Sequence, residues 1–471
     1  MKLKLVVASM SVLGLISFPV FADTTTATTV TTATTADNNT QTATQPKHKH
    51  HHHYYHHHHH KAMAPQTVAA VERHDYKDMG ALPVETCPVV NNYTMMLDFM
   101  SQNVGRAKPT VHCMDPISFA GGMNFDSHWG SRDIGYMGEN QRRLALNDAY
   151  LNVYGNVNEW VKAFASLSYS GFNGVSSITS TRLAGIYSNA YTNDKLTLEQ
   201  GIITFSNTDV TPIFVRVGKM FADFGRYAIH PITESLTQTM SESLNTAAQV
   251  GFMTQMGFSG SLYTFNNDLK KVTNGHTQNN FGVSLGFAQP NDQLGYDLGI
   301  GYLNDFTGVN DVGYAVGKYN GSSGAQSGVG GTYQKRISAG NFYGDLNSGP
   351  FTVGVRYVSA LSTFNSADLG NKASPVVSTG GAKPWSADIT GGYGFNGWGK
   401  DQNVYLGYQA SGNAVNLLMP KSRWTAGYGI DVWKNTNLGL QVNHDNAYSQ
   451  GTGGTGNSSN TIAARAAVKF G

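Results

Sequence analysis

Apolar and polar residues alternate along most of the chain from about residue 117 onward. In the clearest segment, 294–302, every second residue is large and apolar, and the residues between are glycine or aspartate. The apolar set is Leu294, Tyr296, Leu298, Ile300 and Tyr302, and the opposite set is Gly295, Asp297, Gly299 and Gly301. An alternation with a period of two predicts β-strands that have one apolar and one polar face.

Comparable segments recur about every 22 residues as far as the C-terminus, which predicts about 16 strands. They are expected near 118–129, 143–156, 161–170, 196–206, 213–219, 248–256, 257–265, 280–288, 294–304, 335–346, 351–360, 385–394, 402–410, 423–432, 436–445 and 458–470. Sixteen strands closed into a barrel enclose an aqueous lumen, whereas eight are filled by their own side chains. The predicted fold class is therefore all-β: a transmembrane antiparallel β-barrel with a disordered N-terminal extension.

The composition favours an outer-membrane barrel over a soluble β-sandwich. Charged residues make up 13% of the chain, about half the ~25% of an ordinary soluble domain. A lipid-facing surface explains this shortage, because a charge at mid-bilayer costs ~2–4 kcal/mol. A charge at Leu298, on the apolar face, should therefore destabilise the barrel far more than a serine at Gly299, on the lumen face. Long connections such as 308–330 and 364–382 match extracellular loops.

The residues before the barrel divide into three predicted regions. Residues 1–22 combine a charged start, a short apolar run and a small residue, Ala22, before the expected cleavage point, which indicates a secretory signal peptide. Residues 23–65, first rich in Thr and Ala and then in His, are too polar to fold. Residues 66–116 form a linker region, and 117–471 form the barrel. An outer-membrane location in a Gram-negative bacterium follows, with membrane lipids as partners.

The tail and the linker carry two candidate structural sites. The tail histidines are candidate ligands for Zn, Ni or Cu, because their neutral imidazoles bind these ions at pH 7. They are His50, His51, His52, His53, His56, His57, His58, His59 and His60. The alternative is a low-complexity spacer without a metal role. Cys87 and Cys113 form a candidate disulfide, as expected for a pair in an exported protein; a metal site that includes His112 and unpaired thiols are the alternatives.

The most distinctive stretch runs from Phe214 to Leu244 and combines a strand with a long connection that is dense in polar and aromatic residues. A connection of this length is uncommon unless it is functional or disordered, and its aromatic residues argue against disorder. We expect residues 220–247 to fold into the lumen and to narrow it with charges that set ion selectivity. The candidate constriction residues are Arg216, Asp223, Arg226, His230, Glu234 and Glu242. An ordinary surface loop is the alternative.

The last predicted strand, 458–470, ends in the aromatic residue Phe470. This ending resembles the C-terminal signal that the barrel-assembly machinery recognises, except that Gly471 follows the aromatic residue. The signal peptide, the N-terminal extension and the Gly-Lys-x-Phe-x-x-Phe-Gly-like element at 218–225 resemble the LbtU-type siderophore porins. The resemblance covers approximately residues 85–471 and is most specific at 214–252. It implies a barrel that imports a ferric siderophore without a plug domain.

An enzyme is not expected. The barrel region has no nucleophile motif such as Gly-x-Ser-x-Gly beside its few histidines, and no phosphate-binding glycine loop. The net charge of +2 indicates no nucleic-acid partner, and no obligatory cofactor is expected. The predicted function is a porin or channel for small polar solutes, with the ferric siderophore as the solute that the resemblance implies and a homo-oligomer as a possible assembly. The rival hypothesis is a structural or surface-interaction barrel with a metal-binding tail.

Overall fold

The computed structural model describes the barrel region of the chain. The described residues are 117–130, 142–170, 195–207, 210–226, 232–254, 256–273, 277–289, 294–319, 331–374 and 376–470. The predicted signal peptide, tail and linker region, with the tail histidines and the cysteine pair, lie outside these residues. Those predictions therefore stay predictions.

Sixteen long strands and one short strand make up the described sheet. The first nine are β1 (Ile117–Gly130), β2 (Arg142–Asn156), β3 (Val161–Ser170), β4 (Lys195–Ser206), β5 (Ile213–Phe221), β6 (Leu244–Met253), β7 (Phe258–Lys271), β8 (Thr277–Gln289) and β9 (Gly295–Leu303). The others are β10 (Thr332–Tyr333), β11 (Ala339–Ser348), β12 (Phe351–Ala360), β13 (Trp385–Gly397), β14 (Lys400–Gly412), β15 (Ser422–Trp433), β16 (Thr436–Asn446) and β17 (Ser458–Phe470).

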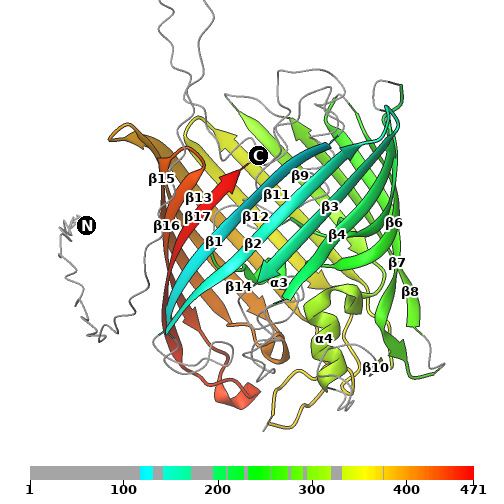
Figure 1. Cartoon of the computed structure of the whole chain (residues 1–471). Helices are drawn as coiled ribbons and strands as arrows, with labels where there is room; N and C mark the ends of the chain where they lie inside the picture. The colour runs from blue at the N-terminus through cyan, green and yellow to red at the C-terminus, as the bar shows by residue number, and fades with distance from the viewer. Residues whose placement is uncertain are drawn as a thin grey trace, which may run out of the picture. The chain divides into compact units, whose positions relative to one another are not determined.

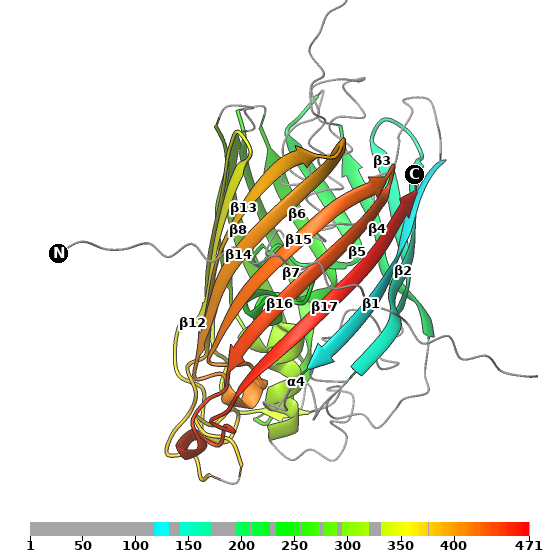
Figure 2. The ribbon, with the colours of Figure 1, turned by 90° about the vertical axis from the view of Figure 1, so that its left-hand side faces the viewer.

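All strands except β10 close into a single antiparallel ring, which makes a 16-stranded barrel (Figures 1 and 2). Each strand pairs with the next along the chain, and β9 pairs directly with β11. The ring closes where β1 pairs with β17, with Gly121 opposite Phe470. The two-residue β10 pairs in parallel with the end of β7 and takes no place in the ring. The predicted antiparallel barrel and its strand number are therefore confirmed.

The two ends of the barrel differ. Connections such as 157–160, 349–350 and 398–399 are short, and we call the end where they lie the short-turn end. In the last of these turns Trp398 and Gly399 both have positive φ, the backbone that a tight hairpin of twisted strands requires. The connections that join strands at the opposite, long-connection end contain α3 (Leu236–Thr239), α4 (Asn310–Tyr319) and the 3₁₀ turns η2 (Phe306–Gly308), η4 (Val415–Leu417) and η5 (Gln450–Thr452). Figure 1 shows α4 and β10 at this end.

The sequence alternation maps onto the two faces of the barrel wall. On β9, Leu298 and Ile300 point outward with 44% and 54% of their surface exposed, whereas Asp297 points inward and is buried. The same division holds on β12, where Val353 and Val355 are exposed and Arg356 is buried. A closed barrel that is apolar outside and polar inside satisfies its backbone hydrogen bonds within lipid. The protein is an outer-membrane β-barrel.

Among the described residues, no helix is long and apolar enough to cross a bilayer.

Several element boundaries differ from the sequence prediction. The connection expected at 220–247 is shorter, because Met220 and Phe221 still belong to β5 and β6 already begins at Leu244. The strand expected at 335–346 begins only at Ala339. The connection 308–330, expected to be a loop, contains α4, since Val309, Val312 and Val316 share one buried face.

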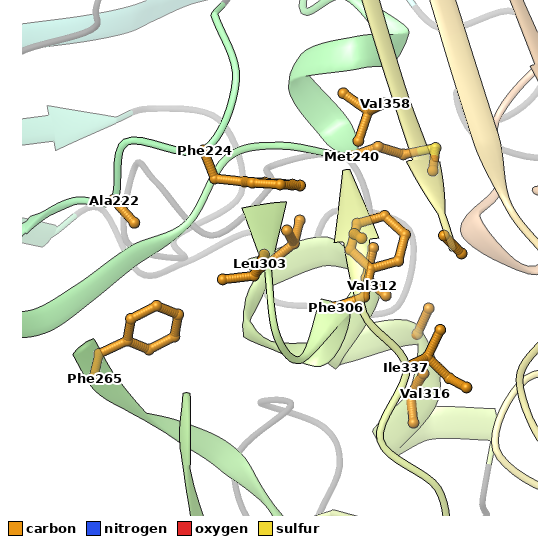
Figure 3. Close-up of a cluster of buried hydrophobic side chains, with 14 of the residues drawn as sticks. Ala222, Phe224, Met240, Phe265, Leu303, Phe306, Val312, Val316, Ile337 and Val358 are labelled. Carbon is orange, nitrogen blue, oxygen red and sulfur yellow. The ribbon is translucent and has the colours of Figure 1, made fainter. Parts of the chain in front are cut away.

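A large cluster of buried apolar side chains includes residues of the β5–β6 and β9–β11 connections (Figure 3). It joins Phe224 from the β5–β6 connection to Phe306 and Val312 from the β9–β11 connection. The rings of Phe224 and Phe306 meet edge to face with centroids 6.4 Å apart, and Phe306 stacks on Phe364 at 6.5 Å. Three connections thus pack on one another and on the inner wall.

Candidate functional site

The β5–β6 connection lies inside the barrel. We call its described residues, 222–226 and 232–243, the inward segment. Figure 1 shows its helix α3 within the ring of strands, and α3 packs on the inner wall formed by β12, β13 and β14. The ring order places these strands opposite β3, β4 and β5, so the segment reaches across the lumen from the wall where it begins.

The first attachment of the inward segment is a buried ion pair. Asp223 Oδ1 accepts a hydrogen bond of 2.9 Å from Arg216 Nη2 on β5. The other carboxylate oxygen, Oδ2, accepts from Ser261 Oγ on β7 at 2.7 Å and from Gln249 Nε2 on β6. Arg216 also donates through Nε to Gln249. Both charged side chains are almost fully buried, with 0% and 2% exposed, so this network fixes the segment to three neighbouring strands.

Arg226 forms the second attachment and is the more accessible charge. Its guanidinium lies 3.3 Å from Asp297 Oδ2 on β9. It also lies 5.1 Å from the ring centroid of Tyr343 on β11, a cation–π distance. The side chain remains 22% exposed. Arg226 therefore contacts the barrel wall and also keeps part of its surface accessible from the lumen.

The far part of the inward segment is held through its backbone by inward-facing side chains of four strands. Arg465 on β17 donates to Ile232 O at 3.0 Å, and Arg423 on β15 donates to Glu234 O at 2.9 Å. In the other direction, Leu236 N donates to Gln409 Oε1 on β14 at 2.8 Å. Gln441 on β16 accepts from Ile232 N. Backbone groups that would otherwise be buried without a partner are thus satisfied.

The two arginines that hold the far part are themselves paired with aspartates. Arg423 Nε lies 2.7 Å from Asp445 Oδ1, and Arg465 makes two bonds of 2.7 Å to Asp126, across the seam between β17 and β1. Such two-point arginine–carboxylate pairs fix the direction of the guanidinium. The charges of the inner wall therefore position the inward segment.

The helix α3 begins at a serine cap. Ser235 Oγ accepts from Gln238 N at 3.2 Å, which satisfies one of the free N–H groups of the first turn. Glu234 accepts from Thr239 Oγ1 at 2.8 Å, and Glu242 accepts from Gln238 Nε2 at 2.8 Å. Both carboxylates belong to half-buried residues. They are therefore ordered acceptors at the edge of the segment.

The β9–β11 connection supports the return of the segment to β6. Ser243 Oγ donates to Gly308 O at 2.7 Å, and Leu244 N donates to Asn310 Oδ1 at 2.7 Å. Within this connection the buried carboxylate of Asp305 accepts from Thr307 N at 3.1 Å and from Tyr333 OH at 2.7 Å. Burial raises the pKa of Asp305, and these hydrogen bonds oppose the rise.

The six residues predicted for the constriction do not form one ring. Arg216 and Asp223 pair with each other inside the wall, and Arg226 pairs with Asp297 instead. Glu234 and Glu242 lie on the part of the segment around α3, and His230 lies outside the described residues. Their role in ion selectivity stays a prediction.

Sequence reasoning missed the partners of the inward segment. Arg423, Gln441 and Arg465 stand at inward positions of β15, β16 and β17, and an arginine at a lumen-facing position was the signal that could have marked two of them. Tyr343 stands at an inward position of β11, between Asn341 and Asp345 on the same face. An aromatic residue on an otherwise polar face is the signal that could have identified it.

Comparison with known proteins gives distant relatives. No family model matches the chain. It is 25% identical over 378 residues to a UPF0422 protein of Coxiella burnetii, covering 76% of this chain and 73% of that protein. It is 24% identical over 347 residues to a UPF0422 protein of Legionella pneumophila strain Lens, covering 69% of this chain. The match spans 62% of the Legionella protein, less than two thirds of its length.

Among solved structures, the chain is similar to the outer-membrane channel DcaP of Acinetobacter baumannii. The identity is 11%, the match covers 75% of this chain and 97% of DcaP, and the TM-score is 0.46. The homologues are thus UPF0422 proteins of Gram-negative bacteria, and the structural neighbours are outer-membrane porins and channels.

Proposed function

We propose that the protein is an outer-membrane channel that passes small polar solutes through a lumen narrowed by the inward segment. The observation that carries the proposal is the attachment of this segment inside the barrel. Asp223 ties its start to β5, β6 and β7, and side chains of β14 to β17 hold residues 232–236. A fixed polar segment inside a barrel restricts which solutes pass and contributes charge where the pathway is narrow.

The chemistry of the segment supports polar rather than apolar solutes. Arg226, Glu234 and Glu242 keep part of their surface accessible, and wall residues such as Asp388 and Gln409 are polar. The ferric siderophore suggested by the resemblance to LbtU-type porins is the finer proposal for the solute. We therefore propose that the protein transports solutes and is not an enzyme. We also propose that the barrel-assembly machinery inserts it and that it forms a homo-oligomer.

A second candidate function is a scaffold or surface-interaction barrel, and one observation favours it. The apolar cluster around Phe306 joins three connections at the long-connection end. Such a cluster could close this end of the barrel against solutes. In that case the long connections and the His-rich tail would act at the cell surface or in the envelope.

Conductance in a planar lipid bilayer separates the two functions. We expect the purified full-length protein to produce discrete current steps in salt solution. Asp223→Asn should change their size, because it removes the buried charge that anchors the inward segment. Asp401→Asn, at the start of β14 beside the β13–β14 turn, should not. The absence of current from folded protein would reject the channel and favour the scaffold. Uptake of labelled ferric siderophore, compared with sugars and amino acids in a deletion strain, then tests the solute.

A further inference from the structure

The rim of the long-connection end, at and beyond the strand ends there, carries an excess of exposed cations. Among the described residues of this rim, the exposed charged side chains are five cations and one carboxylate, Asp268. The cations, which we call the basic arc, are Lys270, Lys335, Arg336, Lys383 and Lys421. At the short-turn end the exposed charges are mixed, since Glu159 and Lys434 are both exposed. The excess of cations therefore belongs to one end of the barrel.

The short strand β10 brings two members of the basic arc to the end of β7. It pairs in parallel with residues 270–271, and Lys335 and Arg336 follow it almost directly. The buried carboxylate of Asp368 accepts a hydrogen bond of 3.0 Å from Lys335 N and one of 2.7 Å from the N–H group before it. The backbone is thus fixed from inside, while the side chain of Lys335 stays exposed.

The cations of the basic arc are available to an external anion. Within the part of the chain that the structure describes, its four lysines form no ion pair. Arg336 Nε lies 3.5 Å from Asp305 Oδ2, and its Nη2 donates to Asn279 O at 3.4 Å, but the side chain is still 37% exposed. Lysine and arginine without a full set of protein partners are the usual ligands of phosphate oxygens.

Outward-facing aromatic pairs lie next to the basic arc, on its side toward the middle of the barrel. Each pair joins neighbouring strands near their long-connection ends. The ring centroids are 4.7–6.4 Å apart in the pairs Phe281–Tyr302, Tyr357–Trp385 and Tyr408–Trp424. Rings of aromatic residues on the outside of a barrel mark the boundary between hydrocarbon and headgroups. These pairs therefore mark that boundary at the long-connection end.

The cations stand directly beyond this boundary. Arg336 contacts Asn279, two residues beyond Phe281 on β8. Lys383 precedes Trp385 by two residues, and Lys421 precedes Trp424 by three. A strand advances ~3.3 Å per residue, so these cations lie ~7–10 Å beyond the aromatic rings. This is the depth of lipid headgroups, not of the hydrocarbon.

We propose that the basic arc binds the phosphate groups of outer-leaflet lipids, with lipid A as the lipid that it holds. The long connections of an outer-membrane barrel face the outside, where lipid A presents phosphate groups on an acylated sugar. The occupant is a lipid and not free phosphate, because the cations adjoin aromatic rings that face the acyl chains. This inference goes beyond solute transport and holds equally for a channel and for a scaffold.

Lipid binding by the purified full-length protein tests the proposal. The protein is titrated with lipid A in detergent, and native mass spectrometry measures the fraction that carries lipid. The triple variant K335Q, K383Q and K421Q should bind lipid A several-fold more weakly than the parent. It removes only lysines without an ion pair and leaves the contact of Arg336 with Asp305 intact. Dephosphorylated lipid A should bind the parent and the triple variant equally.

The matched control removes three charges at the short-turn end. The variant K400Q, K434Q and K469Q should bind lipid A as the parent does, because these lysines lie at the opposite end of the strands. Heat-modifiable gel mobility checks folding in each case. Parent-like binding by the folded triple variant of the arc, or an equal loss in both triple variants, would overturn the proposal. Displacement of lipid A by an equal concentration of inorganic phosphate would also overturn it, because the arc would then hold a free anion.

Labelling of intact cells tests the side of the membrane on which the arc lies. With Cys87 and Cys113 replaced by serine, K383C should react with a maleimide that does not cross the outer membrane. K434C, in the β15–β16 turn at the short-turn end, should react only after the cells are opened. The reverse result would place the basic arc in the periplasm, away from lipid A, and would overturn the proposal whether or not the protein conducts ions.

Discussion

The ring of Tyr343 on β11 lies directly over Gly299 on β9. The two residues face each other across the strand pair, and a Cβ atom added to Gly299 would be 2.3 Å from Cε1 of the ring. The guanidinium of Arg226 lies 5.1 Å from the centroid of the same ring. Because residue 299 is glycine, the Tyr343 ring has room to lie where it contacts Arg226 of the inward segment.

This relationship revises the effect expected for Gly299→Ser. The sequence correctly placed Gly299 on the inner face, but the change is not mild, since Tyr343 must move to admit the new side chain. We expect Gly299→Ser to lower the urea midpoint for unfolding and to alter conductance through Arg226. Gly391→Ser is the control, because an added Cβ there would have its nearest neighbour at 3.8 Å. Equal effects of the two substitutions would contradict the contact.

The neighbouring position tests the outward face. Leu298 is 44% exposed on the lipid side of β9. Leu298→Arg should destabilise the barrel by ~2–4 kcal/mol if the position lies near the middle of the bilayer. Leu298→Ala, which adds no charge, is the control. Heat-modifiable mobility across a urea series in lipid vesicles measures both, and an arginine variant as stable as the alanine variant would argue against the assigned facing.

Much of the fold is predictable from sequence, because residues of a barrel strand face lipid and lumen in turn and therefore alternate between apolar and polar. All sixteen ring strands were located this way, from β1 at Ile117 to β17 at Phe470. The helix α4 was missed although Val309, Val312 and Val316 carry a helical spacing. The many glycines of 308–330 instead favoured the prediction of a loop.

The partners of the inward segment could not be predicted in the same way. Ile232 contacts Gln441, 209 positions along the chain, and Arg465 contacts Asp126 at a separation of 339. Such pairs depend on the closure of the ring, which no local pattern encodes. Inner-face glycines pose a related problem. The sequence does not distinguish a glycine that merely occupies a polar face from one that leaves room for an aromatic ring. Gly299 leaves room for the ring of Tyr343.

The buried pair of Arg216 and Asp223 predicts a strong effect on stability. Asp223→Asn keeps the shape of the side chain but leaves Arg216 without its counter-charge in a site where both are almost fully buried. Breaking a buried ion pair by removing one partner costs about 3–5 kcal/mol. Urea unfolding should show this loss, and Asp401→Asn, at an exposed hydrogen bond, should change the midpoint little. Wild-type stability of the Asp223 variant would mean that the pair does not hold the segment.

The His-rich tail predicts a metal affinity that depends on pH. Imidazole binds Zn, Ni or Cu ions only when it is neutral, and its ordinary pKa is about 6.5. We expect the purified protein to retain Ni on dialysis near pH 7.5 and to lose it by about pH 5, as the imidazoles protonate. Replacing the histidines of 50–60 with glutamine should abolish the retention and leave conductance unchanged. Retention by the substituted protein would move the metal site to another part of the chain.

The charges of the inward segment predict opposite changes in ion selectivity. Arg226 and Glu234 both keep accessible surface on a segment inside the lumen. A charge in a narrow, partly dehydrated pathway acts on a passing ion at an effective dielectric well below that of water. At 4 Å and a dielectric near 20, two unit charges interact by ~4 kcal/mol, against ~1 kcal/mol in water. Arg226→Gln should therefore shift the reversal potential under a salt gradient toward cation preference, and Glu234→Gln toward anion preference. Both shifts should shrink at high salt, because mobile ions screen the fixed charges. Lys434→Gln is the control, since Lys434 is exposed in the β15–β16 turn. If both lumen variants keep the parent's reversal potential and conductance, the ions do not pass the inward segment, and the constriction lies elsewhere or does not exist.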